Sequence, residues 1–253
     1  MQALTDLSAL YITDLVRHYP GAERPAVNNL CLDVAEGEFF GLLGPNGAGK
    51  TTTISIVCGL LKVDKGAVKV MGHQAGSPAV QGLIGFVPQE IALYETLSAR
   101  ENLRFFGAMY DLSGKELDTQ IDSLLNQFGL LERADDQIRF FSGGMKRRVN
   151  IMAALLHGPR LLILDEPTVG IDVQSRALIN TYLQELNRSG TTILYTSHHL
   201  DEAERLCSRL AIMDHGSIIA MGTPAELLHA HGCKDLESVF LKLTGRALRD
   251  HSA

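Results

Sequence analysis

The stretch GPNGAGKT, from Gly44 to Thr51, constrains this chain more than any other part of its sequence. Two glycines bracket four residues and are followed by Lys50 and a threonine, which fills the pattern Gly-x-x-x-x-Gly-Lys-Ser/Thr. The apolar run FFGLL precedes it and a helix-like run follows, so the pattern predicts a strand, a turn and a helix. Because glycine lacks Cβ, backbone N–H groups in such a turn can converge on the phosphates of a nucleoside triphosphate. The alternative is a glycine-rich turn that arose by chance and binds nothing.

The side chains of this turn have distinct expected roles. Lys50 is expected to bridge the β and γ phosphates, and the Thr51 hydroxyl is expected to bind Mg²⁺. The predicted nucleotide-binding residues of this segment are Gly44, Pro45, Asn46, Gly47, Ala48, Gly49, Lys50, Thr51 and Thr52.

A second candidate segment is LLILDEPT, in which apolar residues lead to Asp165 and Glu166. The apolar run predicts a buried parallel strand, and ligands of α/β sheets lie at the carboxyl ends of such strands. Asp165 therefore suits the Mg²⁺ shell, while Glu166, one residue further, suits a base that accepts a proton from attacking water. The alternative is that these residues merely end a strand and open a turn.

Bulk composition excludes several classes of protein. The 253 residues suffice for one large domain or two small ones, and a net charge of −6 does not favour a nucleic-acid partner. The cysteines are scattered without a Cys-x-x-Cys pair, which indicates reduced thiols and no zinc. MQALTDLSAL lacks the features of a secretory signal, and apolar runs such as IMAALL are too short to span a bilayer. We therefore expect a cytosolic or cytosol-facing protein.

The segment FSGGM, around Ser142, forms a second turn at the start of a predicted helix. Ser142 can cap this helix, whose first amides present partial positive charge to whatever lies beyond them. Taken alone, the segment is better explained as an ordinary capped helix.

Together, GPNGAGKTT, FSGGM, LLILDEPTVGID and TSHHLDEAE resemble an ATP-binding cassette (ABC) ATPase in order and spacing, over about Tyr11 to Gly222. The resemblance implies an α/β P-loop NTPase core with a mainly parallel sheet, an antiparallel β portion and an inserted α-helical subdomain. It also implies a head-to-tail dimer that binds ATP and Mg²⁺, each ATP lying between one subunit's P-loop and its partner's Ser-Gly-Gly turn. Ser142, Gly143, Gly144 and Met145 would thus act in trans, with Met145 where the family commonly has Gln.

The resemblance implies further site residues. Gln89 in GFVPQE matches a loop that contacts Mg²⁺ and senses the membrane partner, and Asp172 in VGID matches a dimer contact. His198 matches a switch histidine that bonds the γ-phosphate, with His199 as the alternative. Tyr19 suits an aromatic shelf for adenine, although a tyrosine in a core strand would look the same.

We interpret residues 1–253 as a single ABC ATPase domain. Its nucleotide-binding core comprises 1–89 and 156–225, its helical subdomain 90–155, and a short C-terminal tail 226–253. GAVKVMG is expected to be an antiparallel strand and AIMDHGSIIAMG a closing hairpin. Within the helical subdomain, Leu103, Phe106 and Tyr110 are expected to share one helix face. SGKE is expected to form a capping box.

The resulting functional prediction is a Mg²⁺-dependent ATPase subunit that pairs with a second such subunit as a homodimer and powers a separately encoded permease. It would bind no nucleic acid and lie at the cytosolic face of the membrane. ALYETLSARENLRFFGAMY resembles the drug-, lipid- and polysaccharide-exporting branch. The alternative is a soluble ABC switch acting on ribosomes or DNA. A GTPase or small-molecule kinase is disfavoured because the chain has no Asn-Lys-x-Asp guanine-reading motif.

Overall fold

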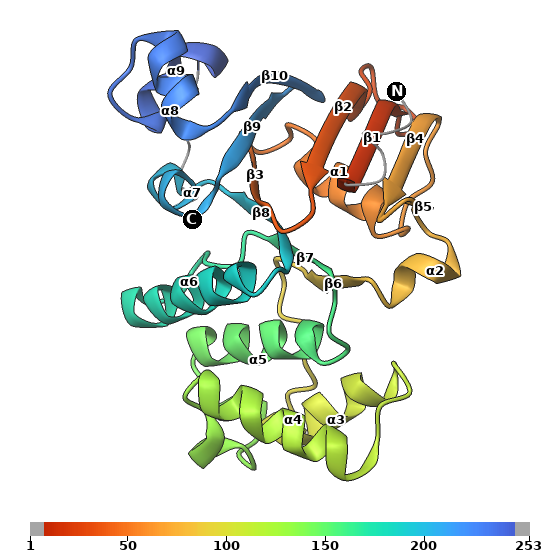
Figure 1. Cartoon of the computed structure of the whole chain (residues 1–253), viewed down its shortest axis with the longest axis vertical. Helices are drawn as coiled ribbons and strands as arrows, with labels where there is room; N and C mark the ends of the chain where they lie inside the picture. Colours follow the sequence, from red (N-terminus) through yellow and green to blue (C-terminus); the bar gives the residue numbers. More distant parts are fainter. Residues whose placement is uncertain (1–7, 246–253) are drawn as a thin grey trace.

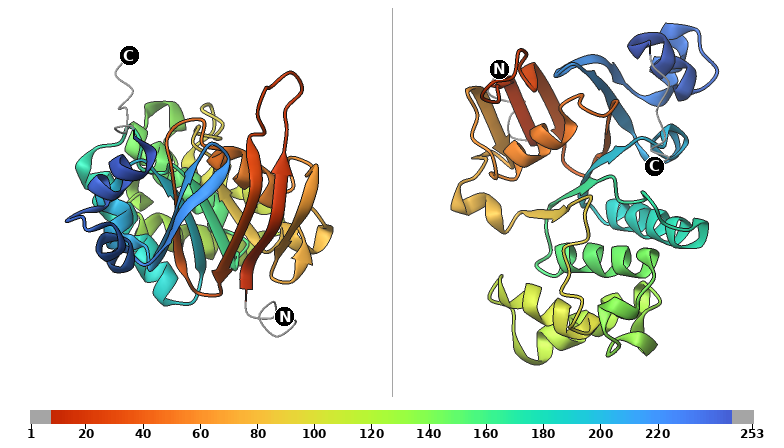
Figure 2. Two further views of the ribbon diagram at one scale, coloured as in Figure 1. Left: turned by 90° about the horizontal axis from the view of Figure 1, so that it is seen from above. Right: turned by 180° about the vertical axis from the view of Figure 1, so that it is seen from behind.

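The computed structural model describes residues 8–245. Residues 1–7 and 246–253 lie outside this range, and with them the outer ends of the predicted core and tail. In Figure 1 the strands occupy the upper part of the molecule and α3, α4 and α5 its lower end. The view from behind in Figure 2 shows the same division.

Within the described residues, one sheet is antiparallel and has the strand order β2-β1-β4-β5. Its strands are β1 (Ser8–Arg17), β2 (Val27–Ala35), β4 (Lys65–Val70) and β5 (His73–Gln74). The predicted strand GAVKVMG is confirmed as β4, which pairs antiparallel with β1.

The other sheet has the order β10-β9-β3-β8-β7-β6. Its strands are β3 (Phe39–Leu43), β6 (Ile84–Val87), β7 (Leu161–Asp165), β8 (Thr192–Ser197), β9 (Arg209–Asp214) and β10 (Ser217–Gly222). All neighbouring pairs are parallel except β9 and β10, which form the predicted hairpin. This sheet carries the carboxyl ends on which the candidate site depends.

The six-stranded sheet is covered on both faces. In β7, Leu161 and Ile163 pack in the cluster shared with the antiparallel sheet and α1. Leu162 and Leu164 point the other way, into the cluster shared with the helices. Because side chains alternate along a strand, a continuous apolar run is what a strand buried on both faces requires. The prediction of a buried parallel strand is therefore correct.

The described chain also contains nine α-helices. They are α1 (Lys50–Val57), α2 (Pro78–Gln81), α3 (Ala99–Ala108), α4 (Gly114–Gln127), α5 (Gly143–Leu155), α6 (Val173–Arg188), α7 (Leu200–Leu206), α8 (Pro224–His231) and α9 (Leu236–Thr244). Short 3₁₀ turns span Leu131–Arg133 and Ile138–Phe140. The helical subdomain carries α3, α4 and α5, which pack on one another. The predicted fold class is confirmed, while the numerical boundaries of its parts stay predictions.

Two local predictions in the helical subdomain are wrong. Ser113 precedes α4, but its side chain makes no capping bond there. Full capping boxes form instead at Ser98 with Glu101 and at Thr223 with Glu226. Tyr110 lies beyond α3 rather than on its face, because the helix ends first and the Tyr110 ring stacks on that of His157, with centroids 3.8 Å apart.

None of the helices between residues 8 and 245 combines the length and apolar character needed to cross a bilayer.

Candidate functional site

The turn between β3 and α1 is built so that only glycine fits its critical positions. Gly47 and Gly49 have φ of +80° and +105°, a region that other residues rarely adopt. A Cβ at Gly49 would collide with the Ala26 carbonyl oxygen, and one at Gly44 with that of Met213. The loop backbone is thus closely packed against Ala26 and Met213, which restricts its conformation.

The first turn of α1 has backbone N–H groups that no capping side chain occupies. Its N-cap is Gly49, which has no side chain to cap the helix, and its first turn holds no acidic residue within the described chain. The opening amides are therefore available to an anion, as expected for phosphate. Other helices, such as α3 and α5, have serine caps that accept from an early amide.

Lys50 lies buried beneath this loop. Its ammonium donates to the carbonyl oxygens of Gly44 at 2.7 Å and Pro45 at 3.2 Å, and lies 3.9 Å from Oε1 of Glu166. Burial lowers the pKa of Lys50, and the charges of Glu166 and Asp165 oppose that change. The ammonium is thus placed between the glycine loop and the end of β7, where a triphosphate would meet both.

Asp165 is held by two threonines. Thr51 donates from Oγ1 to Oδ2 at 3.1 Å, and Thr196 donates to Oδ1 at 2.7 Å. The Thr196 oxygen also accepts from the backbone N–H of Glu166 at 3.0 Å. The hard oxygens of Thr51 and Asp165 therefore lie side by side, which is a donor set that suits Mg²⁺.

Glu166 begins the turn after β7 in a strained backbone conformation. Its φ is +49°, which costs a non-glycine residue about 1–3 kcal/mol and persists only where surrounding structure enforces it. Its Oε2 lies 3.2 Å from Nδ1 of His198. This hydrogen bond lowers the pKa of Glu166 more than burial raises it, and Lys50 assists. The carboxylate is therefore ionised and directed toward His198.

The two neighbouring histidines make different contacts, although their ring centroids lie only 4.3 Å apart. His198 follows β8 and contacts Glu166, as described above. His199 is instead the N-cap residue of α7. Its backbone N–H donates to Oγ of Ser197 at 2.9 Å. Burial lowers the pKa of His199. This geometry favours His198 as the switch histidine, a role that stays a prediction.

Gln89 lies in an exposed bend after β6. Its backbone is anchored by Arg147 of α5, which donates to the carbonyl oxygens of Pro88 at 2.7 Å and of Gln89. Arg147 is itself buried, so the pairing is shielded from water. The segment expected to sense a membrane partner is thereby tied to the helix that begins at Ser142.

The FSGGM turn starts α5 as predicted. Ser142 is the N-cap, and its Oγ accepts from the N–H of Met145 at 3.3 Å. Accepting this bond does not use the hydroxyl's own hydrogen, which can still donate to a ligand. Ser142 and Gly143 are exposed. Met145 is half-buried, and its sulfur contacts the Arg133 guanidinium at 3.6 Å.

Gly144 has a packing role within the chain. A Cβ there would collide with Oγ of Ser175 and approach Oδ2 of Asp172 to 2.8 Å. Asp172 is the N-cap of α6, with Oδ1 accepting from the N–H of Ser175 at 2.8 Å. These bonds lower the pKa of Asp172. The starts of α5 and α6 therefore meet at Gly144, and the predicted dimer contact Asp172 also caps a helix.

Tyr19 lies in the loop after β1 and is 38% exposed, which excludes the alternative of a core tyrosine. Its hydroxyl lies 3.5 Å from Oγ1 of Thr52, in the first turn of α1. The Arg17 guanidinium lies 5.4 Å from the centre of its ring. An accessible aromatic ring beside the phosphate loop is compatible with the predicted adenine shelf.

The two cradles belong to different parts of the molecule. α1 packs on β4 and β7, whereas α5 packs on α3, α4, α6 and β6. Figure 1 shows α1 beside the strands in the upper part and α5 in the lower part, and Figure 2 agrees from behind. The structure therefore brings together Lys50, Thr51, Asp165, Glu166 and His198. It leaves Ser142 and Gly143 exposed elsewhere on the same chain.

The sequence reasoning missed two residues that touch this site. Thr196 is a polar residue in a largely apolar strand, two positions before His198. Because residues two apart lie on the same side of a strand, this spacing could have indicated that Thr196 lies near the site. Arg147 gave no such signal, because an arginine in KRR looks like a solvated surface residue. Its burial depends on how α5 packs against the segment after β6.

Comparison with known proteins agrees with these features. Residues 27–169 match the family described as ABC transporter. The linearmycin resistance ATP-binding protein LnrL of Bacillus subtilis (strain 168) is 51% identical over 207 residues, covering 81% of this chain and 67% of that protein. The Nod factor export ATP-binding protein I of Cupriavidus metallidurans is 45% identical over 214 residues, covering 83% and 71%.

Solved structures agree as well. One, described as an ATP-binding subunit of an ABC transporter, has a TM-score of 0.84 at 32% identity and covers 93% of this chain and 99% of its own. Another, a dimeric ATP-binding cassette in a post-hydrolysis state with ADP and Pi, has a TM-score of 0.77 at 26% identity, covering 85% and 98%. Together with the phosphate loop and the LLILDEPT strand end, these matches show that the chain belongs to the ABC transporter family, among its ATP-binding subunits.

Proposed function

We propose that this chain is a Mg²⁺-dependent ATPase that dimerises around two ATP molecules and powers a separate permease, at the cytosolic face of the membrane. The observation that carries the proposal is the separation of two half-sites on one chain. Lys50, Glu166 and His198 lie together at one place, while the exposed Ser142 and Gly143 lie at another. A second copy turned head to tail would complete both.

The residues fit the groups that the proposed reaction needs. Thr51 and Asp165 would hold Mg²⁺ through adjacent oxygens, with Gln89 as a further ligand, and the bound ion would neutralise phosphate charge. Lys50 would exchange its present carbonyl partners for phosphate oxygens. Tyr19 would support the adenine ring.

Glu166 is proposed to accept a proton from the attacking water. A base must be ionised and directed, and the hydrogen bond with His198 contributes to both. His198 is proposed to contact the γ-phosphate through its imidazole ring. Ser142 and Gly143 of the partner would donate to the phosphates from the opposite side.

Ser142→Arg tests the contribution in trans. It should leave ATP binding by the monomer unchanged but reduce turnover to background, because the new side chain blocks the partner's nucleotide. Nucleotide titration and a phosphate-release assay would measure the two effects. Ser113→Arg is the matched control, an exposed serine before α4 with no capping bond, and should behave like the parent. Loss of monomer binding in Ser142→Arg would contradict the assignment in trans.

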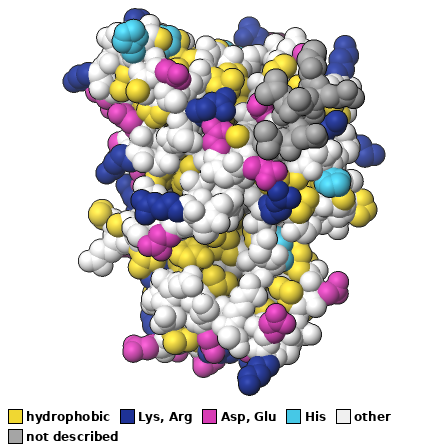
Figure 3. Space-filling model, in the orientation of Figure 1, with side chains coloured by type: hydrophobic (Ala, Val, Ile, Leu, Met, Phe, Trp, Pro, Cys, Tyr) yellow, Lys and Arg dark blue, Asp and Glu magenta, His cyan; other side chains and the backbone are white. Residues whose placement is uncertain are grey.

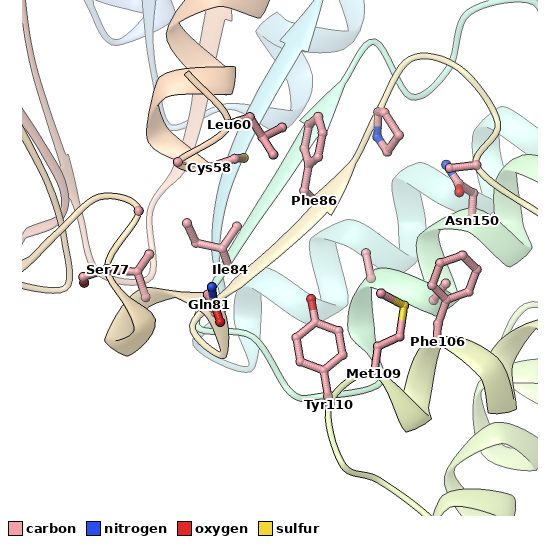
Figure 4. A pocket seen from close by; sticks show the side chains of 17 residues that line it. Cys58, Leu60, Ser77, Gln81, Ile84, Phe86, Phe106, Met109, Tyr110 and Asn150 are labelled. Atoms are coloured by element: carbon pink, nitrogen blue, oxygen red, sulfur yellow. The ribbon is translucent and has the colours of Figure 1, made fainter. Parts of the chain in front are cut away.

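The permease is proposed to dock in an apolar cavity of about 620 Å³ between α1, α2, β6, α3 and α5. Figure 4 shows Leu60 and Phe86 facing Phe106, Met109 and Tyr110 across it. None of the described residues that line it is charged. Pro88 is part of the wall, so an occupant would touch the segment that Arg147 anchors. Figure 3, in the orientation of Figure 1, shows hydrophobic side chains exposed near the middle of the molecule, between its sheet-rich and helical parts.

The exposed apolar rim makes this cavity testable. Met109 and Leu60 are 68% and 66% exposed and line the same cavity, and a contiguous exposed apolar patch marks an interaction site where isolated apolar residues do not. Met109→Glu should release the tagged chain from the membrane fraction of its own cells, because a charge would be buried on docking.

The control for Met109→Glu is Ile219→Glu, an exposed apolar position on β10. It should remain in the membrane fraction, and both purified variants should retain the parent's ATPase rate. Retention of Met109→Glu in the membrane fraction would refute this docking site. A parent chain found only in the soluble fraction would instead favour a soluble ABC switch.

The direction of transport is proposed as export. The two relatives named above are a linearmycin resistance protein and a Nod factor export protein, of whose lengths the chain covers 67% and 71%. We propose the same direction of transport for this chain, but we do not assign it the substrates of those relatives.

A further inference from the structure

A buried carboxylate joins three segments that flank the candidate site. Glu202, in the first turn of α7, is 2% exposed. Its Oε2 accepts from Thr168 at 2.8 Å and from the Tyr195 hydroxyl at 2.9 Å. Its Oε1 lies 3.3 Å from Nε of Arg176 and 3.5 Å from Nδ2 of Asn180. Each partner comes from a different element or loop than Glu202 itself.

The partners of Glu202 suit a carboxylate. Every contact just described is with a donor or a cation, and a buried carboxylate needs such partners to remain charged. The side chain of Arg176 is 31% exposed and supplies the compensating charge. Burial and the charge of Glu202 raise the pKa of Tyr195, so its hydroxyl keeps its proton and donates it.

Two of these partners, Thr168 and Tyr195, lie close in sequence to residues of the proposed reaction. Thr168 follows Glu166 in the same turn, which is also closed by a bond from the N–H of Val169 to the carbonyl oxygen of Glu166. Holding Thr168 restrains this turn and with it the left-handed backbone of Glu166. Tyr195 is adjacent to Thr196, which positions Asp165.

The other two connections reach His198 and α6. α7 begins at Leu200, directly after the histidines, so fixing Glu202 fixes the helix that follows His198. Arg176 lies in the first turn of α6, whose N-cap is Asp172. One carboxylate therefore links the proposed base, the proposed switch histidine and the helix that meets Gly144.

We propose that Glu202 is a positioning residue that sets the distance between Glu166 and His198. It would act through Thr168 and Tyr195, which donate to its carboxylate, rather than by contact with the reacting atoms. This inference rests on the proposed roles of Glu166 and His198 in ATP hydrolysis.

The test separates positioning from general stability. Thr168→Val removes one bond to Glu202 without changing side-chain shape greatly, and Glu202→Ala removes all of them. Both should lower kcat by about ten- to a hundredfold, the range expected when reacting groups are displaced by about 1 Å, and leave the Kd for ATP within about twofold. Hydrolysis and nucleotide titration on the purified full chain measure both quantities.

Two controls address structural effects. Val68→Ala in β4 destabilises a buried position away from this network and should leave kcat unchanged. Asp201→Asn removes an exposed carboxylate from the same helix, α7, and should also match the parent. The thermal unfolding temperature of every variant would also be measured. The kcat values of variants that lose similar stability can then be compared directly.

The double variant completes the test. Because both substitutions break one pathway, Thr168→Val with Glu202→Ala should lower kcat no further than Glu202→Ala alone. A fall in ATP affinity parallel to kcat, or a loss of kcat no larger than in Val68→Ala, would overturn the inference. If Glu202→Ala does not fold, Thr168→Val and Tyr195→Phe decide the question alone. A parent chain without ATPase activity would refute the proposed function instead.

Discussion

Glu166→Gln should lower kcat for ATP by about 10²–10⁴, the usual effect of removing a positioned general base. Glutamine keeps the size of the side chain, and the neighbouring backbone bond to Thr196 does not depend on the carboxylate. The bond to His198 would persist in weaker form. ATP binding should therefore survive while proton transfer from water fails. A phosphate-release assay beside nucleotide titration would measure the difference.

The same variant should accumulate as an ATP-bound dimer. If ATP occupies both half-sites and hydrolysis is what opens them, blocking hydrolysis traps the closed state, which ATP then stabilises by mass action. Gel filtration with Mg²⁺-ATP should give a dimer and with Mg²⁺-ADP a monomer. Asp165→Asn is the informative comparison, because a neutral amide is a poor Mg²⁺ ligand and should weaken Mg²⁺-ATP binding itself.

Each result that contradicts this prediction has a distinct meaning. Hydrolysis by Glu166→Gln at the parent rate would remove Glu166 as the base. Elution as a monomer under both nucleotides would contradict closure of the isolated subunit around ATP. Glu116→Gln, on the exposed side of α4, should match the parent in both assays.

Local sequence patterns predicted the elements that one contiguous segment determines. The glycine loop, the buried strand ending at Asp165 and the β9–β10 hairpin all follow from spacing and apolar pattern. The SGKE segment failed because a capping box needs a specific orientation of Ser113, which a four-residue pattern does not determine. At Ser98 the orientation is right, because its Oγ accepts from the N–H of Glu101 and its own N–H donates to the Glu101 carboxylate.

Contacts between distant segments could not be predicted from the sequence. Arg147 and Glu202 are buried because α5 and α7 pack on the sheet, and nothing in KRR or HHLDEAE distinguishes them from solvated charges. Gly144 was assigned to phosphate binding alone, although Ser175 and Asp172 leave no space for a Cβ. Such requirements arise from tertiary packing, where a residue far along the chain decides what fits.

Lys50→Ala should abolish tight ATP binding. Removing one member of a buried charge pair costs about 2–5 kcal/mol, which corresponds to an increase in Kd of at least about 30-fold. The loss of affinity is increased by the neighbouring carboxylates. Glu166 lies 3.9 Å from the Lys50 ammonium, and the negative charge of Asp165 also interacts with that ammonium. Without the lysine, these two carboxylates would repel the phosphates. Titration with a fluorescent ATP analogue would measure the change.

The apo protein must be compared as well, since Lys50 also bonds the carbonyl oxygens of Gly44 and Pro45. If the loop collapsed on losing these bonds, the thermal unfolding temperature without nucleotide would fall and reduced affinity would say little about phosphate. We expect that temperature to change little, because Gly44 and Gly49 are packed against Met213 and Ala26 independently of the lysine. Lys62→Ala, an exposed lysine after α1, should bind ATP like the parent. Near-parent affinity in Lys50→Ala would mean that the glycine loop does not hold the triphosphate.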